Sequence, residues 1–445
     1  MASAMVIGWG VPEFIGFFNR TGDTVSNSLR FGAFPGQSRS RLHYGVSAYL
    51  SWEYKGSWLG WTTFVLRPHD FRASSSRITP MRISQVRAAS FALSTFCLCS
   101  RTIVAYDGAS KVTTRATPGS GKPVIAKTDK AGAIHLLYDS EDGPKYSKST
   151  DSGVTFGPAI PVVSGVPQTA GLEFAAWDMA LGKGGRVHVA MGTNAWKLKL
   201  PQEEWGFFYA ILDSGSTAFS PVRNINRKPS EGFSLAADDD GKVTACWLSD
   251  KLYANVSHDN GESFAPYVEI DRSYNPCNCC TTSAAYGEDG RLAVLYREET
   301  DNDRDMYLIL WDQDQGRTTR KRVGRTSWKI DACPMTYFTV TSERSGFVAV
   351  WPTKGQIYFG RLDGQGNASG QAEIKTRGRS GMRTGVLALT ANDGNTLVAW
   401  KKDGQTTWQL FDADGSPSGS TGSVESRGNG LAGVVGKDGR FILFR

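Results

Sequence analysis

The chain has 445 residues, of which 40% are hydrophobic and 21% charged, and its formal net charge at pH 7 is +7. This composition excludes a disordered chain and a collagen-like repeat, and it is typical of a folded protein with a large core. Residues 1–80 carry +4 of the charge and residues 81–101 the other +3, so the rest of the chain is close to neutral. Without an overall basic face, we expect no nucleic-acid partner.

Residues 1–80 show no regular pattern from which a domain is predicted. They hold eight Lys and Arg against four Asp and Glu, and their four Trp lie in a background rich in Gly, Ser and Arg. We interpret them as not belonging to the mature protein, because the segment that follows is typical of a true N-terminus. The alternative interpretation is a basic disordered extension.

The segment 81–101 has the pattern of a secretory signal peptide. A basic stretch from Met81 to Arg87 is followed by twelve mostly apolar residues, Ala88 to Cys99, and then by polar residues. Twelve residues are too few to span a bilayer, so we predict no membrane span. The pattern predicts a secreted or periplasmic protein, with bacterial-type export starting at Met81. A buried apolar segment is the alternative.

The chain then repeats one pattern seven times: a short apolar stretch, a turn rich in Asp and Gly, and an alternating apolar stretch. The alternating stretches begin at Ile134, Val187, Val243, Leu292, Phe347, Leu397 and Phe441. Each copy predicts a β-hairpin, because the turns supply positive φ and the alternation gives one buried face. A period of about 50 residues with four strands per unit predicts a β-propeller.

We therefore predict an all-β fold, in which residues 102–445 form a single propeller of seven four-stranded antiparallel blades. The last blade is expected to close the ring by pairing the C-terminal strands, within 431–444, with an N-terminal strand near 111–117. If residues 431–445 pack onto the first unit instead, the propeller has six blades.

A second motif, Ser-x-Asp-x-Gly-x-x-aromatic, occurs in full at residues 149–156 and 257–264 and in shortened form near Asp213, Asp314 and Asp414. In such a turn the Asp carboxylate accepts backbone N–H groups, the Gly takes a positive φ and the aromatic ring anchors the loop. This structural role is assigned to Asp151, Gly153, Phe156, Asp259, Gly261 and Phe264. The motif is the Asp box, and residues 120–445 resemble the sialidase (neuraminidase) superfamily and its Asp-box propeller relatives.

Five cysteines follow the signal-like segment. Cys246 stands alone on an expected strand, as a small buried hydrophobe does. The other four precede the fourth and fifth repeats, so they should meet between neighbouring blades: Cys277, Cys279, Cys280 and Cys333. In an exported protein they predict two disulfides, with three pairings open. The alternative is a metal site of four thiolates. We expect the disulfides, and no metal or other cofactor.

Propeller geometry predicts which loops share a face. The turns between strands 1–2 and 3–4 of each blade lie on one side, the first face, while the 2–3 loops and the connections between blades lie on the other, the second face. The Gly turns and Asp boxes belong to the first face. The second face receives the cysteine segments, the charged loop 297–305 and the long loop 196–205, and we predict the functional site there.

The cysteine segments, together with the sequences around Arg297, Arg304 and Trp328, also look like a set found in secreted bacterial proteins of a sialidase-like subgroup. Sialidases use a Tyr nucleophile assisted by Glu, an Asp acid and three Arg that clamp the sugar carboxylate. The resemblance implies an exo-α-sialidase-like glycoside hydrolase, with candidate catalytic residues Arg297, Glu298, Arg304, Asp305 and Tyr307. Candidate substrate-binding residues are Trp196, Trp205, Trp328, Lys329 and Arg383.

One departure from the sialidase pattern keeps a second function open. Where that family has an Arg-Ile-Pro motif on the first blade, this chain has Gly121-Lys122-Pro123. The alternative is a non-catalytic propeller that binds a glycan or a protein through Trp rings and basic side chains. A carbohydrate or glycoconjugate is the expected partner, and no oligomeric state is predicted. Ca²⁺ at Asp301, Asp303 and Asp305 is not favoured, because the Gly and distal Glu of a calcium loop are absent.

Overall fold

The computed structural model describes residues 111–164, 171–369 and 373–445, together with the backbone of four strands nearer the N-terminus. The chain divides into two compact units, Met1–Tyr106 and Asp107–Arg445. The first unit contains one antiparallel sheet of β1 (Ala4–Ile7), β2 (Phe14–Thr21), β3 (Thr24–Arg30) and β4 (Tyr49–Tyr54). The signal-like segment 81–101 lies outside the described residues. No helix in the described part of the chain is long and apolar enough to cross a bilayer.

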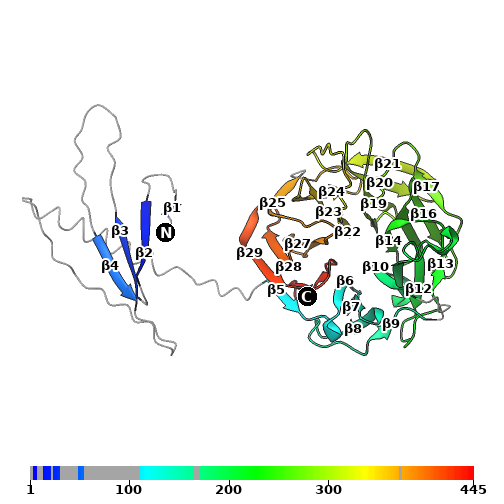
Figure 1. Cartoon of the computed structure of the whole chain (residues 1–445), viewed down its shortest axis with the longest axis horizontal. Coiled ribbons are helices and arrows are strands. Elements are labelled where there is room, and N and C mark those ends of the chain that lie inside the picture. The colour runs from blue at the N-terminus through cyan, green and yellow to red at the C-terminus, as the bar shows by residue number, and fades with distance from the viewer. Residues whose placement is uncertain are drawn as a thin grey trace, which may run out of the picture. The chain divides into compact units, whose positions relative to one another are not determined.

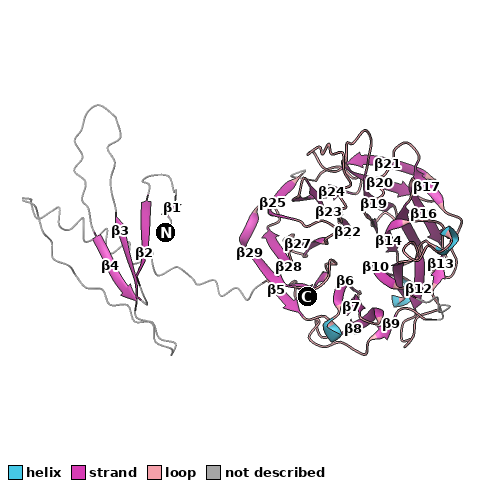
Figure 2. Ribbon diagram, in the orientation of Figure 1, coloured by secondary structure: helices cyan, strands magenta, loops and turns pink. Residues whose placement is uncertain are grey.

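The second unit is a propeller of seven sheets around a central axis (Figure 1), and strands make up nearly all of its regular structure (Figure 2). Blades 1 to 3 are β6 (Lys122–Thr128), β7 (Ile134–Ser140), β8 (Gly143–Ser149) and β9 (Ile160–Pro161); β10 (Phe174–Leu181), β11 (Val187–Thr193), β12 (Phe208–Leu212) and β13 (Arg223–Asn224); and β14 (Glu231–Ala237), β15 (Val243–Leu248), β16 (Leu252–Ser257) and β17 (Val268–Asp271).

Blades 4 to 6 are β18 (Thr282–Tyr286), β19 (Leu292–Arg297), β20 (Met306–Asp312) and β21 (Arg317–Arg322); β22 (Thr339–Glu343), β23 (Gly346–Thr353), β24 (Gln356–Asp363) and β25 (Ile374–Arg379); and β26 (Val386–Thr390), β27 (Thr396–Lys402), β28 (Gln405–Phe411) and β29 (Pro417–Glu425). Blade 7 is β30 (Gly433–Val435), β31 (Phe441–Phe444) and β5 (Val112–Arg115). Three short 3₁₀ turns complete the described elements: η2 (Pro118–Ser120), η3 (Lys183–Gly185) and η4 (Gln202–Glu204).

The predicted propeller of seven blades is confirmed, and so is the placement of the repeat. Each of the seven repeat positions is the first or second residue of the second strand of its blade, as Ile134 is in β7 and Phe347 in β23. Seven sheets exclude the six-bladed alternative. The first strand of each sheet is the innermost one, so the starts of these strands surround the central axis (Figure 1).

The ring closes where the sequence predicted, with a difference in strand direction. β5 pairs with β31, and the pairing is parallel, with Val112 opposite Phe441 and Arg115 opposite Phe444. The reason is topological. Because β5 leads directly into the first strand of blade 1, it runs as the fourth strand of a blade does, in the same direction as the second. Blade 7 has no third strand among the described residues, so these two like-directed strands become neighbours.

The hydrophobic core lies between neighbouring blades. Between blades 3 and 4 it contains Cys246 of β15 and Leu292 of β19, both fully buried, which places Cys246 as the sequence predicted. Side chains also link one blade to the backbone of the next. The carboxylate of Asp178 in blade 2 accepts the N–H of Leu235 in blade 3 at 2.8 Å, and the hydroxyl of Ser283 in blade 4 accepts the N–H of Val340 in blade 5 at 2.9 Å.

The two full Ser-x-Asp-x-Gly motifs form turns between the third and fourth strands on the first face. The carboxylate of Asp259 accepts the backbone N–H of Ser263 at 2.9 Å, and that of Asp151 accepts the N–H of Thr155 at the same distance. Gly261 has φ +81°, and a Cβ at this position would lie 1.9 Å from the hydroxyl of Tyr209. The glycine is therefore required by both the backbone conformation and the contact with blade 2.

Candidate functional site

A cavity of about 1200 Å³ opens on the second face at the mouth of the central channel. We call it the central pocket. Every blade contributes to its wall near the start of its innermost strand, in blade order through Lys122, Glu173, Glu231, Cys280, Tyr337, Arg383 and Asn429. The pocket is therefore built by the ring closure itself, since no single blade supplies more than a part of the wall.

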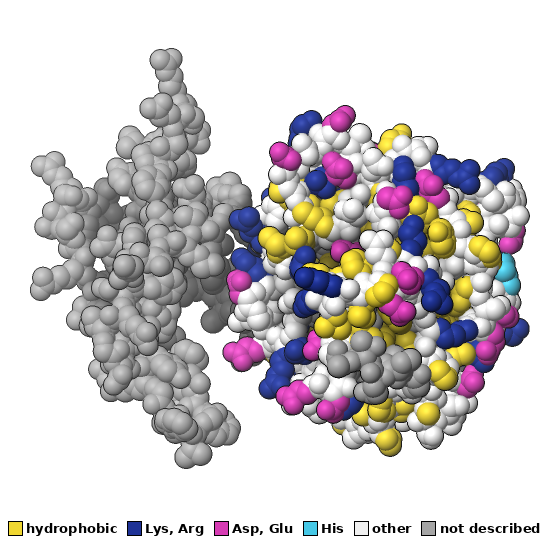
Figure 3. Space-filling model, turned by 45° about the vertical axis from the view of Figure 1, so that its right-hand side comes forward, with side chains coloured by type: hydrophobic (Ala, Val, Ile, Leu, Met, Phe, Trp, Pro, Cys, Tyr) yellow, Lys and Arg dark blue, Asp and Glu magenta, His cyan; other side chains and the backbone are white. Residues whose placement is uncertain are grey.

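One side of the central pocket is aromatic. Trp177 packs edge-on against Phe233 with ring centroids 5.3 Å apart and lies 6.1 Å from Tyr337. Trp196 stands on the long loop of blade 2 with 59% of its surface exposed, while Trp205 donates its indole N–H to the carbonyl of Leu200 at 2.9 Å and so fixes that loop. At the propeller surface, hydrophobic side chains are interspersed with acidic and basic ones (Figure 3). The pocket thus offers flat rings beside charged groups.

Three polar side chains of the pocket come from three different blades: Glu231, Tyr337 and Arg383. Glu231 is open to the pocket, yet the surrounding protein raises its pKa by desolvation, and Arg383 opposes this. Burial likewise raises the pKa of Tyr337, again opposed by Arg383. Arg383 is held in place because its backbone N–H donates to the carbonyl of Met335 at 2.8 Å and its Nε–H to the Met335 sulfur at 2.9 Å.

Of the residues that the sequence nominated, the pocket brings together Arg383, Trp196 and Trp205, and does not include Trp328 or Lys329. Glu231 and Tyr337 were missed. Each lies at or just before the start of an innermost strand on the second face. Their position is the signal that the sequence offered: a polar residue at the start of an innermost strand should line the pocket.

Arg297, at the end of β19, is fully buried and lies outside the central pocket. Its guanidinium donates to the hydroxyl of Thr336 at 3.2 Å and to the carbonyls of Arg304 and Pro352, each at 2.5 Å, and it lies 5.1 Å from the ring of Trp328. These bonds direct the guanidinium into the protein interior. In this arrangement Arg297 contacts the connection between blades 4 and 5 and does not line the central pocket.

Glu298 and Tyr307, nominated as a nucleophile pair, both contact Arg320 of the outer strand β21. Arg320 forms an ion pair with Glu298, and its guanidinium lies 3.3 Å from the centre of the Tyr307 ring. The hydroxyl of Tyr296 donates to the carboxylate of Asp271 at 2.5 Å on the same side of the blade. Because Tyr296 and Arg297 are neighbours on one strand, they point to opposite faces of the sheet. Arg297 therefore lies on the other face from the group around Arg320 that holds Glu298 and Tyr307.

The remaining nominated residues come from the loop between β19 and β20 of blade 4 and from the connection between blades 4 and 5. Asp305 accepts the N–H of Trp328 at 2.9 Å and forms an ion pair with Arg322 at 2.6 Å. Lys329 is exposed and lies 3.9 Å from the carboxylate of Asp303. Asp303 and Asp305 therefore face different cations. Among the described residues, they do not form with Asp301 a group of ligand atoms close enough to share a calcium ion.

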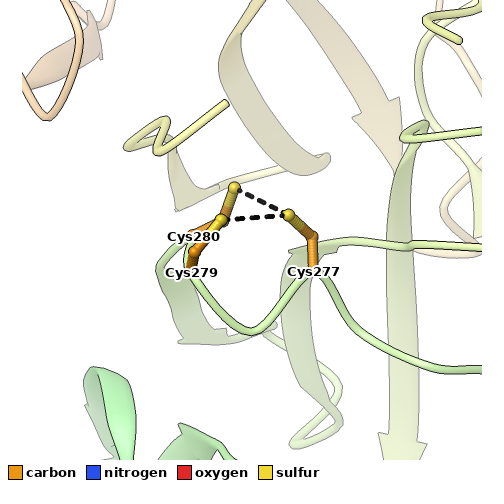
Figure 4. A group of neighbouring side chains, drawn as sticks. All are labelled: Cys277, Cys279 and Cys280. Carbon is orange, nitrogen blue, oxygen red and sulfur yellow. Dashed lines mark hydrogen bonds between the residues drawn. The ribbon is translucent and has the colours of Figure 1, made fainter. Parts of the chain in front are cut away.

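The four clustered cysteines do meet between blades 4 and 5. Cys279 and Cys333 are joined by a disulfide, whereas Cys277 and Cys280 are unbonded and buried, so only one of the two expected disulfides is present. The Cys277 sulfur lies 3.5 Å from that of Cys279 and 3.4 Å from that of Cys280, and the three sulfurs point toward one another (Figure 4). Cys279 and Cys280 also line the central pocket.

Positive charge surrounds these thiols. Arg304 donates from Nη1 to the Cys277 sulfur at 3.1 Å. Burial raises the pKa of Cys280, but its hydrogen bond with Cys277 and the nearby Arg297 outweigh this effect and hold the pKa below its usual value. The thiol of Cys277 is the partner that keeps its proton, and its pKa is raised through that bond to Cys280. The two guanidiniums therefore favour the anionic form of these sulfurs.

No protein-family model matches the chain, and no curated protein matches it. Among solved structures it is similar to an ulvan lyase, a polysaccharide lyase, with a TM-score of 0.47 and 12% identity over 71% of this chain and 87% of that one. It is also similar to an α-L-arabinanase of Penicillium chrysogenum, with a TM-score of 0.40 and 13% identity over 71% of this chain and 97% of that one. A third similar structure is the WD40 domain of Toxoplasma gondii coronin, with a TM-score of 0.41 and 12% identity over 72% of this chain and 75% of that one. Similarity at this level carries no conclusion about activity. The resemblance to sialidases stays a prediction from the sequence motifs.

Proposed function

We propose that this protein recognises an acidic glycan in the central pocket. The observation that carries the proposal is the combination, in one cavity, of an aromatic side with two basic side chains contributed by separate blades. Trp177 and Trp196 offer ring faces on which a sugar stacks, and Lys122 and Arg383 offer cations for a carboxylate or sulfate. Lys122 belongs to the sequence segment where sialidases carry their first-blade arginine.

The proposal includes export. The signal-like segment 81–101 supports a secreted or periplasmic protein that begins at Met81, because its basic start and apolar stretch follow the pattern that the secretion machinery recognises. N-terminal sequencing of the protein from its natural source tests this part. A secreted chain that still contains residues 1–80 would contradict it.

A second candidate function is hydrolysis of the bound glycan by sialidase-type chemistry. It is favoured by one observation, the presence of Tyr337, Glu231 and Arg383 around the same cavity, because those enzymes need a Tyr nucleophile with a Glu partner beside a carboxylate-binding Arg. In this variant of the proposal Arg383 binds the substrate carboxylate and Tyr337 attacks the anomeric carbon while Glu231 takes the phenolic proton. The glycosidic bond breaks as the new bond forms, and the aglycone oxygen leaves with a proton from solvent. Water then hydrolyses the glycosyl–tyrosine bond, and the proton returns to Tyr337. The Tyr307–Glu298 pair is not used, since Arg320 occupies both side chains.

Binding of a panel of acidic and neutral oligosaccharides to the purified protein, followed by calorimetry, tests the first proposal. Replacing Arg383 by Ala should weaken binding of an acidic glycan about 10–100-fold, because a charge-assisted hydrogen bond is lost. Trp196→Ala should weaken acidic and neutral ligands alike. Arg440→Ala, an exposed change on the first face, is the matched control and should leave affinity unchanged. If no acidic glycan binds the wild-type protein, the proposal is wrong.

Fluorogenic sialosides and uronides then separate binding from catalysis. If the hydrolysis proposal is right, the wild-type protein releases the fluorophore and Tyr337→Phe abolishes release while still binding the glycan. Binding without any release supports the first function and excludes the second.

A further inference from the structure

The cysteine cluster between blades 4 and 5 carries an inference independent of glycan binding. The sulfurs of Cys277, Cys279 and Cys280 lie within 4.8 Å of one another, and Cys333 is bonded to one of them. Four sulfurs from two segments 54 residues apart are therefore gathered at one point. A tetrahedral zinc site has Zn–S distances of about 2.3 Å, which places its sulfurs about 3.8 Å apart. The sulfur pairs at 3.4 and 3.5 Å need only a small expansion to reach that geometry.

The positive charge around the cluster indicates which protonation and bonding state of the sulfurs is favoured. Arg297 is fully buried, and its hydrogen-bond acceptors in the described residues are one hydroxyl, two carbonyls and the sulfur of Cys280. Arg304, which is 13% exposed, donates to the Cys277 sulfur and has Glu299 only at 3.9 Å. A buried guanidinium without an anionic partner is very costly. The carboxylate of Asp305 also acts electrostatically on Arg297, but it already forms an ion pair with Arg322. The sulfurs are left as the anionic partners.

The possible states of the four cysteines differ in the charge that they supply. Two disulfides carry none, and one disulfide with a thiol–thiolate pair carries −1. Four thiolates around one divalent cation carry −2, which the two guanidiniums of Arg297 and Arg304 neutralise. We propose that Cys277, Cys279, Cys280 and Cys333 form a tetrathiolate site for one Zn²⁺ ion in the reduced protein.

The disulfide and the metal-bound form are two states of the same sulfurs. A thiol or phosphine reductant supplies two electrons to the Cys279–Cys333 bond, and each sulfur takes up one proton. Zn²⁺ then binds the four sulfurs and displaces the protons that they still carry. Since Cys279 and Cys280 line the central pocket, the ion would lie at its wall.

Cobalt binding to the full chain tests the site. After reduction with a phosphine and removal of oxygen, Co²⁺ should bind one per chain and give the strong visible bands and the near-ultraviolet thiolate-to-cobalt absorption of a tetrahedral sulfur site. Zn²⁺ should displace it. Cys277→Ser and Cys280→Ser should each weaken binding at least about 100-fold, and Arg304→Gln about 10–100-fold because it removes an N–H···S bond. Cys246→Ser, which removes a buried thiol elsewhere, should change nothing.

Circular dichroism before and after metal addition makes each outcome decisive. If the reduced wild-type chain stays folded and takes up no Co²⁺ stoichiometrically, the proposal is overturned. If it unfolds on reduction, recovery of the β-sheet signal with Zn²⁺ supports the site and failure to recover overturns it. Equal loss of binding in Cys246→Ser and Cys277→Ser also overturns it. If a serine variant fails to fold, Arg304→Gln provides the test. Zinc should raise the Tm of the reduced wild-type chain but not that of the Arg304→Gln variant.

Discussion

The two faces of the propeller are built in different ways. On the first face, each turn is closed by residues a few positions apart, as when Asp259 accepts the N–H of Ser263. Arginines then join the finished turns of neighbouring blades, as when Arg186 donates to the carbonyl of Asn260 at 2.9 Å. On the second face, the bonds join distant segments: Arg297 reaches the carbonyl of Pro352, and Cys279 is bonded to Cys333, 54 residues away. A short sequence motif therefore specifies a first-face turn, whereas the second face exists only once the ring has closed. This difference predicts unequal sensitivity to mutation.

The largest expected effect belongs to the second face. Replacing Arg297 by Met should lower the free energy of unfolding by roughly 3–5 kcal/mol, because it leaves the carbonyls of Arg304 and Pro352 and the thiolate pair without their donor and counter-charge. Arg317→Met, an exposed arginine on the outer strand of the same blade, is the control and should cost less than about 0.5 kcal/mol. Urea unfolding of the three proteins under the same redox conditions gives both values. A loss below 1 kcal/mol for Arg297→Met would remove the asymmetry between the faces.

The next effect tests whether turns on the first face are stabilised only by contacts within the turn. His188 of blade 2 is fully buried, and its Nδ1 lies 2.5 Å from the hydroxyl of Tyr209, against the turn of blade 3 that contains Gly261. Burial, with help from Arg186, lowers the pKa of His188 to about 4. The unfolded chain takes up a proton below about pH 6.5 while the folded chain does not, so stability should fall as the pH drops from about 6.5 to 4.

This fall should amount to about 3 kcal/mol, which is of the order that such a pKa difference implies. Urea unfolding at several pH values measures it. In His188→Phe the slope over this window should flatten, whatever the variant's stability at pH 7. His258→Gln, which changes an exposed histidine, should keep the wild-type slope. An unchanged slope in His188→Phe would assign the acid sensitivity to other groups.

The smallest effect is expected at a local turn. Asp259→Ala removes the acceptor of the Ser263 N–H and of the hydroxyls of Ser257 and Ser263. Because the turn is exposed and water replaces part of these bonds, the loss should be about 1 kcal/mol. Asp259→Asn keeps an acceptor and should recover part of it. Thermal unfolding followed by circular dichroism is sufficient, and a loss as large as that of Arg297→Met would contradict the comparison.

The fold was predictable because its signals are local and repeated. Apolar alternation and Gly-containing turns recur seven times, and each copy became the first hairpin of a blade. The closing strand at Val112–Arg115 was also predictable, since a ring needs a partner for its last hairpin; its parallel direction was not. The predicted meeting of the cysteine segments followed from the same geometry, which puts connections between blades on one face.

The candidate site was predictable only in part. Arg383, Trp196 and Trp205 were found by their place on second-face loops, and they line the central pocket. Arg297 and Glu298 were nominated from the same loops, yet their side chains turn to Thr336 and to Arg320. Position in a loop predicts the face on which a residue lies but not the direction of its side chain, because that direction depends on which neighbour offers a hydrogen bond or an opposite charge.

The sequence by itself determined the seven repeated hairpins and their turns, since hydrophobic periodicity and turn residues act within a few positions of one another. The structure decided that the last hairpin pairs with Val112–Arg115 as a seventh blade. Only the tertiary structure decided that Glu231, Tyr337 and Arg383 share a cavity and that two arginines face a group of thiols. The three pocket groups come from different blades, separated by about 50 residues or more, and Arg304 is 27 residues from the Cys277 sulfur to which it donates. No local pattern encodes their distances, which are set by the packing of one blade against the next.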